Sequence, residues 1–235
     1  MTAPSPASAA PGLLIVWMNI EPGHEADFDG WYTREHVPER VGVPGFRIGA
    51  RYEAISGEPR FLGVYDTDSA QVLSGAAYLG RLNHPTPWTQ RVMPAFQDTV
   101  RAIGSLIGEQ GRGLGGMLRT VRIEPAAGRR DALREALGGS TGAALLRELY
   151  GQPGIARVRA MEAVERPSSA DTAETAMRGR DRSATFVLLV DGNDAAAIQQ
   201  ACDRVLPPAR LAGLGAAGPG ETGDYRLLYA LAAPR

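Results

Sequence analysis

Short apolar runs and amphipathic stretches alternate along the first half of the chain, with turn residues between them. Leu13–Ile20 is apolar and contains β-branched and aromatic residues, which predicts a strand. From His24 to about Val41 the apolar positions recur with a helical period, which predicts a helix. One face of this helix, at positions i, i+3, i+4, i+7 and i+8, is formed by Phe28, Trp31, Tyr32, Glu35 and His36.

The remaining elements of the first half follow from the same patterns. The predicted strands are Phe46–Ile55, Arg60–Thr67 and Val100–Gly108. The predicted helices are Asp68–Leu82 and a short one that starts at Thr86-Pro87, since Thr caps a helix well and Pro suits its first position. The resulting order, β-α-β-β-α-β, is that of the split βαβ or ferredoxin-like unit.

Three short motifs of the first half return in the same order in the second half, at offsets of 103, 109 and 109 residues. The pairs are Ile20-Glu21-Pro22 with Ile123-Glu124-Pro125, Pro44-Gly45-Phe46 with Pro153-Gly154-Ile155, and Glu53-Ala54-Ile55 with Glu162-Ala163-Val164. Two later strands also end alike, in Asp66 and in Asp191. Matches in a constant order indicate a duplicated unit. Its second copy supplies predicted strands at Met117–Pro125, Ala184–Val190 and Tyr225–Ala232 and a predicted helix at Asp194–Leu206.

The duplication predicts how the chain is divided. We expect a disordered tail at residues 1–12, a first ferredoxin-like repeat at 13–110, a linker at 111–116 and a second, degenerate repeat at 117–235. The glycine-rich linker has no helix after it, so it is not interpreted as a phosphate-binding loop. Two loops break the symmetry: residues 166–182, which have no apolar period and are expected to be mobile, and residues 207–224, which are rich in Gly, Ala and Pro.

A four-stranded split βαβ sheet carries helices on one face, so its other face must be buried against something else. Here one chain supplies two such sheets, and they can cover each other and close toward a barrel with the helices outside. The predicted fold class is therefore α+β, with two tandem ferredoxin-like repeats whose sheets pack face to face as a pseudo-dimeric α+β barrel.

The amino-acid composition excludes several kinds of catalytic and cofactor chemistry for this chain. All 25 cationic residues are Arg, and a chain without Lys forms neither a lysine Schiff base nor a Walker A loop. Cys202 is the single cysteine, which excludes an internal disulfide, a Cys-based zinc site and an iron–sulfur cluster. The formal net charge is −1, so no long-range field favours nucleic acid or an anionic membrane. No apolar run approaches the roughly 20 residues of a membrane helix, and we expect a cytoplasmic protein with neither kind of partner.

Two segments of the first half resemble the dimeric α+β barrel superfamily, most of all its EthD-like and related uncharacterised members. They are the run from Trp31 to Arg40 (WYTREHVPER), followed by Val43-Pro44-Gly45-Phe46, and the run from Asn83 to Trp88 (NHPTPW). The resemblance covers about residues 13–110, and the second half matches in outline. It implies a barrel built from ferredoxin-like units. Members of the superfamily include cofactor-free monooxygenases, lactone isomerases, polyketide cyclases and haem-binding enzymes.

His36 is the first candidate for a catalytic residue. It shares its helix face with Phe28, Trp31 and Tyr32, so it is expected to point toward the sheet or a cleft beside it. An imidazole there can accept or donate a proton near neutral pH, and a nearby Glu35 or Glu39 is positioned to orient it. The alternative is a structural histidine at a helix end, where it caps carbonyls and favours the negative end of the dipole.

Further residues are candidates for contacts with a ligand. Each also has a structural interpretation: core packing for the aromatic residues, turn chemistry for the Asn-His-Pro segment, an exposed strand end for Asn19, and ion pairing for the arginines. The candidates are Trp31, Tyr32, Trp17, Asn19, Arg51, Asn83, His84 and Trp88. Arg157 and Arg159 share one strand face of the second half, and an ion pair is the favoured interpretation for them as well.

The three histidines do not predict a metal site. His24 and His36 are about 18 Å apart along one helix, and no spacing motif joins His36 to His84. Some two-repeat α+β barrels hold haem through a histidine of the second half, whereas this chain has no histidine after His84. At the offset of 109, His36 aligns with Leu145, so we expect one pocket per chain, in the first half.

These observations favour a small-molecule enzyme that acts without an organic cofactor or metal on an apolar, oxygenated compound. Proton transfer, isomerisation, cyclisation or cofactor-free oxygenation are all compatible with His36 as general acid or base. One alternative is a non-catalytic ligand-binding or assembly protein, which predicts a filled barrel and no cleft reaching His36. Another is a haem-binding protein that uses a histidine of the first half. A homodimer of pseudo-dimeric chains is a further expectation.

Overall fold

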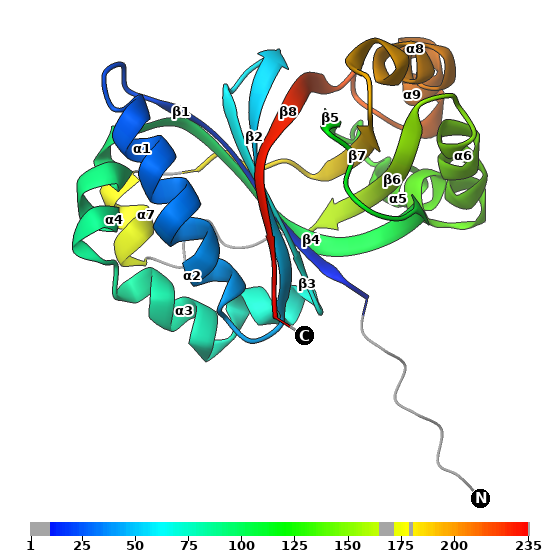
Figure 1. The fold of residues 1–235 in the computed structure, drawn as a ribbon. Helices are drawn as coiled ribbons and strands as arrows, with labels where there is room; N and C mark the ends of the chain where they lie inside the picture. Colours follow the sequence, from blue (N-terminus) through cyan, green and yellow to red (C-terminus); the bar gives the residue numbers. More distant parts are fainter. Residues whose placement is uncertain (1–9, 165–171, 179–180, 235) are drawn as a thin grey trace, which may run out of the picture.

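A computed structural model describes residues 10–164, 172–178 and 181–234 of the chain. Within these residues, eight antiparallel strands close a barrel in the order β1-β3-β2-β8-β5-β7-β6-β4. Helices of the first half, together with α7 (Ala173–Arg178) of the second, cover one side of the barrel, and the other helices of the second half cover the opposite side (Figure 1). No helix of the described part is both long and apolar enough to span a membrane.

Each half runs in the order that the sequence predicts. The first half consists of β1 (Gly12–Ile20), α1 (Glu25–Trp31), the π-helical turn η1 (Tyr32–His36), α2 (Val37–Val41), β2 (Phe46–Ser56), β3 (Phe61–Thr67), the 3₁₀ turn η2 (Ala70–Ser74), α3 (Ala76–Asn83), α4 (Pro87–Val92), the 3₁₀ turn η3 (Met93–Ala95) and β4 (Phe96–Gly111). The second half consists of β5 (Met117–Ile123), α5 (Arg130–Gly138), α6 (Ser140–Tyr150), β6 (Ile155–Ala163), α7 (Ala173–Arg178), β7 (Phe186–Gly192), α8 (Ala195–Val205), α9 (Pro208–Leu214) and β8 (Glu221–Ala232).

The last strand of each half joins the two halves. β4 pairs with β1 of its own half, where Leu14 faces Ile103, and continues to pair with β6, where Gly104 faces Ala163. β8 joins the second half to the first in the same way. It pairs with β5 of its own half and with β2 of the first half, where Arg51 faces Tyr229. These two junctions close the barrel, and they confirm the predicted pseudo-dimeric arrangement of two ferredoxin-like units.

The side chains of each strand alternate between two cores, because successive residues of a strand point to opposite faces. In β1, Leu13, Ile15 and Trp17 belong to the cluster that fills the barrel. Leu14, Val16 and Met18 belong to the cluster between the sheet and the helices of the first half. A third cluster lies between the sheet and the helices of the second half. The interior of the barrel is thus packed with apolar side chains.

Three details of the local structure differ from the prediction. The helix expected at 24–41 contains a π-helical turn, and the helix expected at Asp68–Leu82 is divided into η2 and α3 by extended backbone at Gly75. The expectation of an irregular loop at 166–182 was wrong for Ala173–Arg178, which form α7. Residues 165–171 and 179–180 lie outside the described residues, so the predicted mobility of this loop stays a prediction there.

The predicted N-terminal tail and the predicted boundary between the repeats can be compared with the described residues. Residues 1–9 of the predicted tail lie outside the described residues, while Gly12 is already the first residue of β1. Gly138 and Gly139 interrupt the helical segment of the second half, since α5 ends at Gly138 and α6 begins at Ser140. A division of the chain at 111–116 stays a prediction, although β4 ends and β5 begins at its two sides.

Candidate functional site

A cavity of about 30 Å³ lies between the outer face of the first-half sheet and its helix layer. It has room for a water molecule. The sheet supplies apolar side chains, Tyr65 and Arg101, the helices supply Tyr32, Tyr78 and His36, and α7 closes the remaining side. The residues of its wall that bear on chemistry include Tyr32, His36, Arg40, Tyr65, Arg101 and Glu174.

The π-helical turn directs His36 into this cavity. A π turn contains more residues than an α turn, so Tyr32 and His36, four positions apart, both face the sheet and are buried. The His36 ring lies 4.3 Å from the ring of Trp31 and 4.9 Å from that of Tyr32, measured between centroids. Its Nδ1 is buried and has no hydrogen-bond partner among the described residues.

The environment keeps His36 neutral. Burial, reinforced by the positive charges of Arg40 and Arg178, holds the pKa of His36 well below its ordinary value of 6.5. The interpretation of His36 as a helix-end cap was wrong, because it lies inside the continuous helical segment formed by α1, η1 and α2. A neutral imidazole with an unpartnered nitrogen beside a cavity is available to accept a proton.

Neither glutamate considered as a partner of His36 takes that role. The Glu35 carboxylate accepts hydrogen bonds from Trp31 Nε1 at 3.1 Å and from the Thr86 hydroxyl at 2.5 Å. Glu39 lies 3.5 Å from the guanidinium of Arg40. The predicted helix start at Thr86 is present, and its side chain accepts from the backbone N–H of Thr89 at 3.0 Å.

Two tyrosines face His36 across the cavity. The hydroxyl of Tyr65 donates to that of Tyr32 over 3.4 Å. Burial is the main reason why the pKa of each phenol lies above its ordinary value of 10.0. Both phenols therefore stay protonated near neutral pH. Because the Tyr65 hydroxyl donates to Tyr32, the Tyr32 hydroxyl is the one that can donate to an oxygen placed beside the imidazole.

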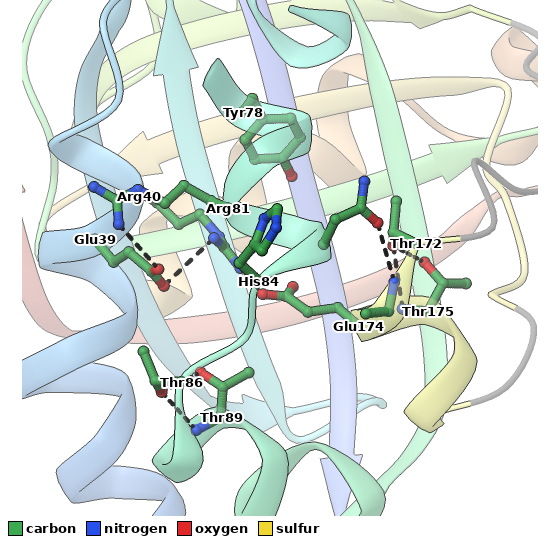
Figure 2. A network of polar contacts seen from close by, with 12 residues as sticks. Glu39, Arg40, Tyr78, Arg81, His84, Thr86, Thr89, Thr172, Glu174 and Thr175 are labelled. Carbon is green, nitrogen blue, oxygen red and sulfur yellow. Dashed lines mark hydrogen bonds and ion pairs between the residues drawn. The ribbon is translucent and has the colours of Figure 1, made fainter. Parts of the chain in front are cut away.

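Arg40 and Glu174 join α7 to the helix layer by a buried ion pair. Figure 2 shows this network, with Glu39, Arg40 and Arg81 on one side and Glu174 and Thr175 of α7 on the other. A second contact with the helix layer is made by Asn83 Oδ1, which accepts from the backbone N–H of Ala173 at 3.3 Å. In Figure 1, α7 lies among the helices of the first half although it belongs to the second.

Sequence reasoning missed the contribution of α7 to the site. The length of its connection was the available signal: residues 164–185 join β6 to β7, whereas residues 57–60 join β2 to β3 in the first half. A long connection inside a compact fold is commonly functional. The apolar pattern gave no indication, because α7 is short and a buried ion pair of Glu174 contributes to its docking.

The aromatic and polar candidates of β1 and of the first helix lie in different environments. Tyr32 lines the cavity, and Trp31 packs behind His36 with its Nε1 donating to Glu35 and Thr89. Trp17 lies inside the barrel, where its Nε1 donates to Thr120 Oγ1 at 3.3 Å. Asn19 is at the barrel end, bonded to Asp98 and to the backbone N–H of Arg60.

The four other candidates lie outside the cavity. Arg51 is buried under α1, 2.8 Å from an Asp29 carboxylate oxygen and stacked on Phe28 and Tyr32. His84 is exposed, with Nδ1 2.8 Å from the backbone carbonyl oxygen of Gly80, and Asn83 is also exposed. Trp88 is half-buried, and its Nε1 donates to Asp27 at 2.8 Å.

The arginines of β6 form the ion pairs favoured by their pattern. Arg159 is fully buried and contacts Asp66 at 2.8 Å and Asp191 at 3.1 Å. Arg157 contacts Asp66 at 3.3 Å and Glu109 at 2.5 Å. Among the described residues, no group of His, Cys, Asp and Glu side chains is arranged to hold a metal ion.

Comparison with solved structures identifies the fold of the chain. No sequence-family profile matches the chain, and no curated protein sequence is significantly similar to it. A solved anthrone oxidase-like protein superposes with a TM-score of 0.61 at 12% identity, over 96% of this chain and 94% of that one. A proposed monooxygenase from Fusobacterium nucleatum superposes with a TM-score of 0.60 at 10% identity, over 96% of both chains. The fold is the dimeric α+β barrel.

A third solved structure is that of a haem-binding protein from Thermus thermophilus, with a TM-score of 0.50 at 9% identity, over 94% of this chain and 92% of that one. The solved proteins similar in fold thus include some named for small-molecule chemistry and one named for ligand binding. At sequence identities this low, the superpositions establish the barrel fold alone. The chemistry of this protein has to be argued from the residues of its own site. The closer resemblance to EthD-like proteins stays a prediction.

Proposed function

We propose that this α+β barrel protein is a small-molecule enzyme whose active site is the cavity beside His36. Its substrate is an apolar, oxygenated compound, and its first step is removal of a proton by the neutral imidazole. The observation that carries the proposal is the unpartnered Nδ1 of His36, buried against a cavity whose wall also holds three phenols and three guanidinium groups. Structural histidines are normally hydrogen-bonded when buried.

The surroundings of His36 suit a reaction that builds up negative charge on oxygen. The lowered pKa keeps the imidazole free to accept a proton, although it also makes it a weaker base. A developing enolate or phenolate offsets this weakness, because it pairs with the imidazolium at a buried site, where charges attract more strongly than in water. Tyr32, which accepts a hydrogen bond from Tyr65, can donate its own hydroxyl hydrogen to that oxygen.

The names of two structural relatives suggest a probe. One is an anthrone oxidase-like protein and the other a proposed monooxygenase. An anthrone has an acidic methylene group next to its aromatic rings. Once that methylene has lost a proton, the carbanion reacts with dioxygen, and the net reaction of anthrone and O₂ gives anthraquinone and water. The cavity is smaller than an anthrone, so α7 has to shift for such a substrate to enter.

The test follows proton removal separately from oxidation. We expect the protein to accelerate deuterium exchange of the dithranol methylene in D₂O without oxygen, followed by NMR. With oxygen present, an electrode and the anthraquinone absorbance report turnover. His36→Gln is expected to lower the exchange rate by about 10²- to 10⁴-fold, the usual contribution of a general base. His24→Gln, at an exposed position, is the matched control.

Two results would count against the proposal. If the wild-type protein accelerates neither reaction for dithranol or for a panel of other enolisable aromatic ketones, the non-catalytic alternative is favoured. If His36→Gln exchanges the methylene as fast as the wild type does, His36 is not the base.

A haem-binding role fits the described site poorly. A porphyrin is several times larger than an anthrone, so its entry into a cavity of about 30 Å³ would need a much larger displacement of α7, and the other histidines are exposed on the surface. The interior of the barrel is itself filled by apolar side chains. The non-catalytic alternative predicts a filled barrel, which the described residues have, and no cleft reaching His36. The cavity beside His36 favours the enzyme on the second point only.

A further inference from the structure

We infer that the substrate of the cavity beside His36 carries an anionic oxygen group on an apolar body, and that Arg101 of β4 recognises this group. The inference rests on the proposed function in that it concerns the same site. It concerns binding, however, and does not depend on whether His36 removes a proton.

The wall of the cavity carries more positive than negative charge. Its ionised side chains are Arg40, Arg101, Arg178 and Glu174. Arg40 has Glu174 and Glu39 as counter-ions, and Arg178 lies 2.7 Å from Asp181. The described residues offer Arg101 no carboxylate within ion-pair distance.

Arg101 instead donates from Nη2 to the hydroxyl of Tyr78 at 3.0 Å. A guanidinium has five N–H donors, and a neutral phenol uses one of them and balances no charge. Arginines that are partly buried are normally paired, since taking an unbalanced charge out of water is costly. An anionic ligand that enters the cavity after α7 has shifted would supply the missing counter-ion and form a strong, charge-assisted hydrogen bond.

The position of Arg101 is fixed by the sheet. Its Cα pairs with Val16 of β1, and its backbone N–H donates to the carbonyl oxygen of Arg182 at 2.8 Å. The rest of the sheet wall is mostly apolar, with Leu14, Val16 and Met18 facing the same space, and the hydroxyl of Tyr65 in this wall donates to Tyr32. A charged anchor on an apolar surface selects a ligand with one anionic group and an otherwise hydrophobic body.

Matched ligand pairs test this on the wild-type protein. Benzoate and benzamide have nearly the same shape and differ in charge, and calorimetry measures their dissociation constants. We expect benzoate to bind at least about tenfold more tightly, the usual effect of a hydrogen bond between charged groups. Pentafluorophenol, ionised at neutral pH, shows whether a phenolate serves as well as a carboxylate.

Substitutions then assign the effect to Arg101. Arg101→Gln is expected to remove the preference for benzoate, and Arg101→Lys to retain part of it because the charge remains. Arg47→Gln, which alters an exposed ion pair of β2 with Asp68, is the matched control and is expected to leave both constants unchanged.

The inference is overturned if benzamide binds as tightly as benzoate, if neither anion binds at millimolar concentration, or if Arg101→Gln keeps the full preference. The comparison of the two ligands on the wild-type protein stands even if Arg101→Gln does not fold. If His36→Gln loses the exchange of the dithranol methylene but binds benzoate as the wild type does, both proposals hold, and they are shown to be independent of each other. Benzoate binding without any His36-dependent reaction would support Arg101 and contradict the proposed function.

Discussion

His36 occupies a position where its charge state is coupled to folding. In the unfolded chain its pKa returns to the ordinary value of 6.5, whereas burial, Arg40 and Arg178 hold it well below that value in the folded protein. As the pH falls through 6.5, the unfolded state therefore takes up a proton that the folded state refuses. The free energy of unfolding falls accordingly, until the pH reaches the lower pKa of the folded protein.

The prediction for this residue is a change in the pH dependence of stability. Between about pH 6.5 and the folded pKa, His36 is expected to lower the free energy of unfolding by up to about 1.4 kcal/mol per pH unit. His36→Gln should remove that part of the slope. Urea unfolding at several pH values measures it, with His24→Gln as control, since His24 is exposed. Parallel stability curves for His36→Gln and the wild type would contradict the prediction.

At the scale of elements, α7 matters most because it belongs to one half and covers the cavity of the other. The ion pair between Glu174 and Arg40 is buried on both sides, with 3% and 2% of the two side chains exposed. Replacing one partner of such a pair leaves the other charge uncompensated. Loss of this contact is expected to undock α7 and to expose His36 to solvent.

Chemical modification of the histidines measures this exposure. Diethylpyrocarbonate acylates neutral imidazoles, and cleavage at Arg34 and Arg40 places His36 on a tryptic peptide separate from those of His24 and His84. Glu174→Gln is expected to raise the modification rate of His36 by about tenfold or more, since each 1.4 kcal/mol lost from docking raises the open population tenfold. The rates at His24 and His84 should stay unchanged.

A matched variant separates this effect from a general loosening. Glu148→Gln removes a surface ion pair with Arg210 on the helices of the second half, 2.8 Å long in the wild type. It should leave the modification of His36 unchanged, because exposed ion pairs contribute little. Equal rates at His36 in the wild type and in Glu174→Gln would show that α7 does not control access.

The helical segment from Glu25 to Val41 and the segment 166–182 show which structural features the local sequence pattern predicts and which it misses. The period of apolar residues correctly placed Phe28, Trp31, Tyr32 and His36 on a buried face, because helix amphipathicity is a local property. The sequence pattern predicted neither the π turn nor the docking of α7. Both depend on contacts with residues distant in the sequence, such as that between Glu174 and Arg40, which are 134 positions apart.

For the whole molecule, the interior of the barrel contains a charged junction between the halves. Asp66 of β3 and Asp191 of β7, the strand ends that match in the repeat, both contact Arg159. Arg159 has no exposed side-chain surface. An ion pair in such a position adds little to stability relative to apolar packing, but removing one partner is strongly destabilising.

Arg159→Met is therefore expected to lower the free energy of unfolding by about 3–5 kcal/mol. Urea unfolding followed by tryptophan fluorescence measures it. Arg134→Met is the control: Arg134 is 60% exposed and contacts Glu162, so its loss should cost less than about 1 kcal/mol. Similar losses for both variants would contradict a special role of the junction.

The sequence by itself determined the order of most strands and helices, the duplication and the α+β barrel, because periodicity and turn residues act locally and two bare sheet faces have to cover each other. It also directed attention to His36. Only the tertiary structure decided that the cavity lies between sheet and helices, that α7 of the second half closes it, and that Arg101 has no carboxylate partner among the described residues. These properties arise from contacts between segments far apart in the chain, whose geometry no local pattern encodes.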